Sequence, residues 1–91
     1  MDLLDALLSL KNRDEAERFL KDLCTPKELN ALMDRFNVCL LLDQNNLSYR
    51  EINRLTKASL TTIGRVARFL RDENHYGYRL VLNRFKRMRR K

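Results

Sequence analysis

The sequence predicts an all-α protein built from six helices, and three observations lead to this fold class. The 91 residues include one proline and two glycines, β-branched runs are scarce, and apolar residues recur at helical spacing along most of the chain. Residues 47–66 have the pattern of two short helices joined by a tight turn, a helix-turn-helix. A chain of this length has room for one modest core, so we assign residues 1–91 to a single domain.

Three helices are expected before that motif. The first lies near residues 2–11, where leucines follow helical spacing, and the second covers about residues 14–23. The third has a well-defined start, because Thr25 can cap it ahead of a proline at the first helical position and Glu28 can close a capping box. It ends at the turn-prone residues 43–46.

The helix-turn-helix is predicted over about residues 48–70. Ser48 and Glu51 form a capping box at the start of its first helix, and Ile52 and Leu55 give that helix an apolar edge.

The second helix of the motif restarts at Ser59 and has two distinct faces. Its apolar face comprises Leu60, Ile63, Ala67 and Leu70. The opposite face carries Thr61, Thr62, Arg65 and Arg68, short and cationic groups suited to base edges and phosphates. In a helix-turn-helix this is the helix that enters the major groove of DNA.

The chain departs from the usual motif at Asn53, where many such units have alanine, and at Lys57. Lys57 stands where many such units have glycine, so a left-handed conformation there would cost about 1–2 kcal/mol. Gly64 within the second helix costs about 1 kcal/mol relative to alanine, and it also removes a side chain where backbone can approach DNA. The alternative interpretation is two ordinary helices of an all-α core.

The charge of the chain is distributed unevenly. Residues 1–47 carry six Lys/Arg and nine Asp/Glu, a net charge of −3, whereas residues 48–91 carry thirteen and three, a net charge of +10. Positive charge therefore begins where the helix-turn-helix begins. A basic field of this kind raises the affinity for polyanions by releasing condensed counterions, so it favours double-stranded DNA as the partner.

The basic C-terminal tail, residues 84–91, contains six of those charges and overlaps a sixth helix predicted over about residues 76–88. Two interpretations stay open: an extension that grips phosphates, or a frayed and solvated segment whose like charges repel. Either way the tail adds affinity rather than sequence preference.

Composition also excludes several classes. No run of 18 apolar residues could span a membrane, and the acidic N-terminus is unlike a secretory signal, so we expect a cytoplasmic protein. Cys24 and Cys39 lack metal-ligand companions, and His75 is the only histidine. We therefore expect reduced thiols in the core and no metal site.

The third helix is apolar over more than one narrow face. Leu40, Leu41 and Leu42 cannot all point into one small core, which indicates burial against a second subunit.

Several motifs resemble the Trp-repressor family. They are Thr25-Pro-Lys-Glu-Leu-Asn-Ala-Leu, Leu47-Ser-Tyr-Arg-Glu-Ile and Thr62-Ile-Gly-Arg-Val-Ala-Arg-Phe-Leu, in the family's order and spacing. Arg65-Val-Ala-Arg and Gly77-Tyr-Arg-Leu-Val-Leu are similar to a Trp-repressor-like branch rather than to the tryptophan-responsive repressor. The resemblance covers most of the chain and is weaker in the N-terminal helix and the tail.

This resemblance implies an intertwined all-helical homodimer, in which the first three helices and the last interlock between subunits. Two helix-turn-helix heads would meet successive major grooves of a palindromic operator, with half-sites about one helical turn apart. The implied action is repression by occlusion of the polymerase.

The resemblance also implies a set of DNA-facing positions. On the first helix of the motif they are Tyr49, Arg50 and Asn53; on the second they are Leu60, Thr61, Thr62 and Gly64. Arg50 is the best base reader, because a guanidinium bonds bidentately to guanine. Leu60 is equally well interpreted as a core residue. Arg65, Arg68 and Arg71 are assigned to phosphates, and differences from the tryptophan repressor at Tyr49 and Asn53 imply a different operator.

The candidate effector pocket consists of Thr25, Arg35, Arg65, Val66 and Phe69. In tryptophan-responsive members two arginines hold the ligand, and both have counterparts here, Arg35 and Arg65. Val66 and Phe69 replace a glycine and a serine of those members, and a packed pocket does not readily accept added bulk. We therefore expect the pocket to be filled by the chain itself, with no cofactor and no response to tryptophan. The alternatives are a different small-molecule ligand, or Val66 and Phe69 side chains that face elsewhere and leave the pocket open. The alternative to a ligand-binding role for the two arginines is that Arg35 pairs with an acidic side chain and Arg65 contacts phosphate.

No catalytic site is expected, because the chain lacks a glycine-rich phosphate loop and any telling Ser/His/acid or Cys/His spacing. The remaining alternative to a DNA-binding regulator is a helical dimeric interaction module, whose basic half binds an acidic protein or RNA.

Overall fold

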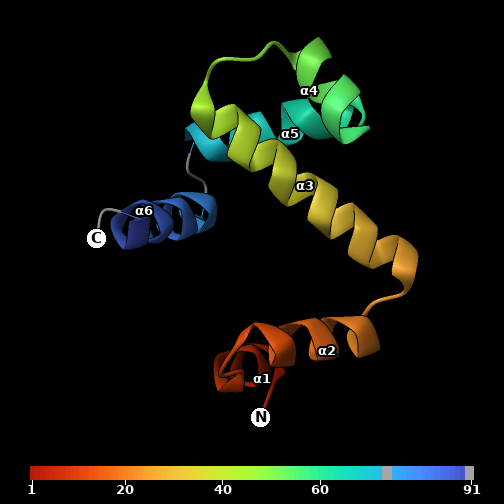
Figure 1. Cartoon of the computed structure of the whole chain (residues 1–91), viewed down its shortest axis with the longest axis vertical. Coiled ribbons are helices and arrows are strands. Elements are labelled where there is room, and N and C mark those ends of the chain that lie inside the picture. Colours follow the sequence, from red (N-terminus) through yellow and green to blue (C-terminus); the bar gives the residue numbers. More distant parts are fainter. Residues whose placement is uncertain (73–74, 90–91) are drawn as a thin grey trace. The chain divides into compact units, whose positions relative to one another are not determined.

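The computed structural model describes residues 1–72 and 75–89. Every element it contains is a helix, as predicted (Figure 1). They are α1 (Leu3–Ser9), α2 (Arg13–Leu23), α3 (Pro26–Gln44), α4 (Tyr49–Thr56), α5 (Leu60–Asp72) and α6 (Gly77–Arg89). Helix α1 ends earlier than predicted because Leu10 adopts an extended conformation. The last two residues of the predicted basic tail, 90–91, lie outside the described residues.

Side-chain caps determine where these helices begin. The predicted box at Thr25 is present: its amide donates to Glu28 Oε1 at 2.8 Å, and the Glu28 amide donates to Thr25 Oγ1 at 3.1 Å. Ser48 and Glu51 make the same exchange at 2.8 and 3.2 Å. Each box satisfies amides that the first turn of a helix leaves unpaired.

Two compact units divide the chain, residues 1–32 and residues 33–91. The first unit holds α1, α2 and the start of α3, and none of its residues is buried. Leucines on α1 are instead exposed, up to 85% for Leu8. Assignment of residues 1–91 to one domain stays a prediction.

The second unit has a small apolar core drawn from α3, α4, α5 and α6. Its buried residues are Val38, Cys39, Ile52, Ala58, Ile63, Val66, Leu70 and Leu82. Leu40, Leu41 and Leu42 are only half-buried against this core, in agreement with the prediction that one chain cannot enclose all three.

The two cysteines differ in their surroundings. Burial raises the pKa of the Cys39 thiol to about 11, so this side chain stays protonated and unreactive at neutral pH. Cys24 is half-buried at the C-terminal cap of α2. The prediction of a core thiol is confirmed for Cys39 and wrong for Cys24, because its unit has no buried interior.

Asp43, near the end of α3, ties that helix to α6. Its carboxylate accepts from Arg79 Nη1 at 2.9 Å and lies 3.0 Å from Lys86 Nζ. Burial alone would raise the pKa of Asp43, but the hydrogen bonds from Lys86 and Arg79 outweigh it and hold that pKa below its usual value.

Replacing Asp43 with asparagine is expected to lower the free energy of unfolding by about 1–2 kcal/mol at pH 7, since charged hydrogen bonds are lost. A carboxylate whose pKa is lower in the folded state stabilises the protein above its unfolded pKa, about 3.8. The difference between wild type and Asp43→Asn should therefore be full at neutral pH and shrink as the pH falls below about 4. Urea denaturation across this range measures it, and a difference independent of pH would contradict the assignment.

Candidate nucleic-acid interface

The turn between α4 and α5 is tight and left-handed at one residue. Lys57 has φ 63° and ψ 7°, the conformation that the motif requires and that glycine usually supplies. Such a conformation costs a non-glycine residue about 1–2 kcal/mol, so other contacts must hold it. The predicted strain at Lys57 is confirmed.

Helix α5 is anchored through one face. Its cap Ser59 accepts the Thr62 amide at 3.0 Å, and Ile63, Val66 and Leu70 are buried in the core. Because these three recur at helical spacing, the opposite face of α5 must be turned outward.

The outward face matches most of the predicted DNA-binding set. On α5 the exposed members of this set are Thr61, Arg65, Arg68 and Arg71, with Gly64 half-exposed among them. On α4, Tyr49, Arg50 and Asn53 are exposed as well. The two helices thus present short and cationic groups together, which is what readout of base edges and phosphates needs.

Two apolar expectations were wrong. Leu55 and Leu60 were assigned to apolar faces, yet they are 62% and 54% exposed. Ile52 is the buried anchor of α4, and α5 enters the core at Ile63. Helical spacing predicts which residues share a face, but not where along the helix that face leaves the core. Leu60 therefore belongs to the exposed surface.

Two polar candidates are already engaged in the motif itself. Asn53 donates from Nδ2 to the Ala58 carbonyl oxygen at 2.6 Å. Thr62 is half-buried, and its Oγ1 accepts from Ser59 Oγ at 3.0 Å. Both assignments to DNA stay predictions, and the structure adds an internal role for each.

Arg54 is a cation that the sequence prediction missed. It is exposed and lies one helical turn after Arg50, so both guanidinium groups are on one side of α4. The spacing of four residues was the available signal. Arg54 adds a second exposed cation to this side of α4.

Replacing Gly64 with alanine should affect the stability of the fold and the binding of DNA in opposite directions. A Cβ built there meets nothing within 4 Å, so Gly64→Ala should stabilise α5 by about 0.5–1 kcal/mol. The same methyl group would stand on the face proposed to meet DNA, where the absent side chain allows close approach. We expect the melting temperature to rise while the affinity for duplex DNA falls. A variant that is more stable and binds equally well would show that DNA does not approach this point.

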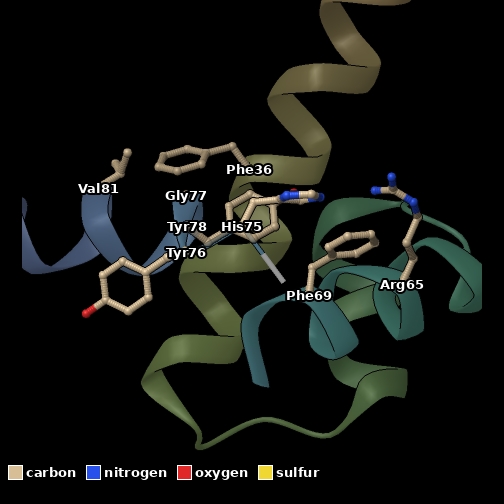
Figure 2. Close-up of a pocket in the computed structure, with 8 residues that line it drawn as sticks. All are labelled: Phe36, Arg65, Phe69, His75, Tyr76, Gly77, Tyr78 and Val81. Carbon is tan, nitrogen blue, oxygen red and sulfur yellow. The ribbon is translucent and has the colours of Figure 1, made fainter. Parts of the chain in front are cut away.

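A pocket of about 500 Å³ lies beside α5. Arg65 and Phe69, on successive turns of α5, form one wall, and Phe36, Tyr78 and Val81 contribute from α3 and α6 (Figure 2). The Arg65 guanidinium carbon lies 4.5 Å from the centre of the Phe69 ring, a cation–π contact. The His75 ring stacks near Phe69 with centroids 6.2 Å apart. The pocket wall is therefore aromatic, and the Arg65 guanidinium lies over the Phe69 ring.

The candidate effector residues do not all line this pocket. Arg65 and Phe69 line it, whereas Val66 is fully buried in the core. Arg35 is half-buried on α3, and its Nε is buried without a hydrogen bond in the part of the chain that the structure describes. Thr25 lies in the first unit, where it caps α3.

Other kinds of site were sought among the described residues. Within residues 1–72 and 75–89, no group of three or more His, Cys, Asp or Glu side chains is placed to hold a metal ion. None of the helices in those ranges is long and apolar enough to cross a membrane.

Helices arranged around a core, with a helix-turn-helix exposed on the cationic half of the chain, define a protein of the helix-turn-helix class. Comparison with known proteins gives the family. The model of the Trp repressor protein family matches residues 1–86. The chain belongs to this family, which consists of DNA-binding regulators and not of enzymes.

Two relatives support the Trp-repressor-like branch that the motifs indicated. The uncharacterized protein YerC of Bacillus subtilis is 40% identical over 84 residues, which are 92% of this chain and 79% of that protein. A TrpR-like protein of Eubacterium eligens has a crystal structure that matches with a TM-score of 0.84 at 40% identity. That match covers 92% of this chain and 84% of the other.

Proposed function

We propose that the protein is a sequence-specific transcriptional regulator that binds a palindromic operator as a homodimer, through the major groove, and acts as a repressor. The observation that carries this proposal is the outward face of α5. Core residues Ile63, Val66 and Leu70 turn Thr61, Arg65 and Arg68 toward solvent. This face lies in the half of the chain with a net charge of +10, thirteen Lys/Arg against three Asp/Glu over residues 48–91.

The dimer is supported by apolar surface that one chain cannot cover. Leu3, Leu4, Leu7 and Leu8 on α1 are 40–85% exposed, and Val81, Phe85 and Met88 on α6 are 40–68% exposed. Soluble monomers rarely leave such stripes uncovered. Helix α1 carries Asp2 and Asp5, whereas the second half of α6 is cationic, so a second copy brings charge complementarity as well. A two-fold dimer would present two copies of α5, one to each half-site of the operator.

The pocket wall supports independence from tryptophan. The Arg65 guanidinium already lies over an aromatic ring of its own chain, Phe69, at 4.5 Å. In the tryptophan-responsive members that the chain resembles, the counterpart of this arginine is one of the two that hold the ligand. Phe69 thus occupies one face of Arg65, while a pocket of about 500 Å³ remains open beside both side chains, and Val66 takes no part because it belongs to the core.

We therefore expect calorimetric titration with tryptophan to give no binding, and added tryptophan to leave the affinity for DNA unchanged. The matched variant is Phe69→Ser, which removes the ring from beside Arg65. Low-micromolar binding of tryptophan to the wild-type protein, lost on replacing Arg65, would contradict independence.

The interaction module that binds an acidic protein or RNA is the second candidate, and the cationic end of α6 favours it. Helix α6 contains Arg84, Arg87 and Arg89 and no acidic residue. These charges would give affinity for many polyanions without reading a sequence.

Selection of bound duplexes from a random DNA pool, at roughly 150 mM salt to suppress purely electrostatic binding, separates the two candidates. We expect enrichment of a palindrome. Binding at low salt with no enriched sequence would reject the regulator and favour the interaction module.

A further inference from the structure

Side-chain hydrogen bonds, in addition to the covalent backbone, hold the link between α4 and α5 in place. Only three residues, 57–59, separate the two helices. The middle one, Ala58, is 8% exposed, with its methyl group in the core. Its position decides where α5 begins, because Ser59, the next residue, caps that helix.

Both backbone polar groups of Ala58 are bound by side chains of α4. The Asn53 Nδ2 donates to the Ala58 carbonyl oxygen at 2.6 Å, and the Ala58 amide donates to Thr56 Oγ1 at 3.1 Å. The Thr56 hydroxyl in turn donates to the Ile52 carbonyl oxygen at 2.8 Å. We call these two side chains, Asn53 and Thr56, the Ala58 clamp.

The clamp has a physical reason. Lys57 is left-handed without being glycine, a conformation that persists only where the surroundings determine it. The three hydrogen bonds of Asn53 and Thr56 fix the backbone at Ala58, the residue that follows Lys57. An unpaired amide at nearly buried Ala58 would also be costly, which makes the Thr56 bond more important than its length suggests.

We propose that the Ala58 clamp sets the direction in which α5 is presented to DNA, and that Asn53 is a positioning residue rather than a base reader. This inference rests on the proposed DNA-binding function. The Thr56 hydroxyl uses its one donor and one of its two acceptor sites within the motif, and the residue is half-buried, so it is poorly placed to contact a base. Any effect of Thr56 on sequence preference should therefore come through the position of α5.

The test compares Thr56→Val, which keeps the shape and removes the hydroxyl, with the matched control Thr56→Ser, which keeps it. Asn53→Ala is the second variant, and its exposed position allows folding even if Thr56→Val does not fold. Full-length proteins are titrated with the duplex selected from the random pool and with a scrambled duplex. Thermal unfolding confirms that each variant is folded.

Asn53→Ala removes one hydrogen bond and should weaken binding to the selected duplex about three- to tenfold, and Thr56→Val removes two and should weaken it more. Binding to the scrambled duplex, which depends on phosphate contacts, should not change. Thr56→Ser should behave as wild type. Single base-pair changes in the duplex should keep their ranking with Asn53→Ala, because the whole helix is displaced.

Lys57→Gly provides a rescue, since glycine adopts the left-handed turn without the clamp. Relative to Lys57→Gly alone, addition of Thr56→Val should cost less affinity than it does in the wild-type chain. A base-reading role predicts no such rescue.

The inference is overturned if Asn53→Ala erases preference at one base pair while Thr56→Val binds as wild type. Failure of the proposed function looks different: the wild-type protein itself would prefer no duplex over the scrambled one. That second result would reject both proposals together.

Discussion

Replacing both Leu4 and Leu8 with glutamate is expected to leave the protein monomeric. These side chains are 68% and 85% exposed in the single chain, one helical turn apart on α1. Burying a leucine contributes about 1.5–3 kcal/mol, and two-fold symmetry counts each position twice. The double variant should therefore lose at least about 6 kcal/mol per dimer, a rise in the dissociation constant of more than about 10⁴-fold.

Sedimentation equilibrium measures this prediction directly. Wild type should have twice the chain mass of 10.9 kDa, and the double variant should have the mass of one chain. Ser9→Glu is the control for introducing glutamate on α1, because it adds one at the next exposed position without removing a leucine. A wild-type protein that sediments as a single chain, or a double variant that stays dimeric, would remove α1 from the subunit interface.

Replacing Arg50 with alanine is expected to abolish sequence preference while leaving the fold intact. Arg50 is exposed on α4 and makes no contact with the core. A bidentate arginine–guanine contact contributes about 1–3 kcal/mol of discrimination, and a dimer loses it at both half-sites. Discrimination between the selected duplex and a scrambled one should fall by about 2–6 kcal/mol per dimer.

Arg87→Ala is the matched control for this loss, since it removes an exposed guanidinium from α6 instead. It should weaken binding to all duplexes alike and reduce the salt dependence, as expected for a phosphate contact. If Arg50→Ala kept its preference and only removal of the basic tail weakened binding, the helix-turn-helix would be structural and the tail functional.

Local signals predicted the fold well. The boxes at Thr25 and Ser48 lie within four residues of sequence, so the starts of α3 and α4 could be predicted from the residue types alone. The left-handed turn at Lys57 was expected from its place in the motif, where glycine is usual, and not from the residue type itself. Where packing decides, as at Leu55 and Leu60, the spacing predicted a shared face but not its exposure.

The site was harder to predict because its roles depend on geometry. Asn53 was assigned to DNA from its position in the motif, but its bond to the Ala58 carbonyl exists only once the turn has formed. Val66 and Phe69 were both counted as bulk in one pocket. Their surroundings differ, since Val66 is in the core and Phe69 lines the pocket. The share of the wall that comes from His75 and Val81 required the tertiary structure.

In the proposed complex, two copies of α5 bind successive major grooves on one side of a duplex. Guanine-N7 methylation protection, on the duplex selected from the pool, tests this most directly because N7 faces the major groove. Binding of two α5 helices in this way predicts two protected segments related by symmetry, with centres about 10 base pairs apart. One protected segment, or uniform weak protection along the duplex, would contradict it.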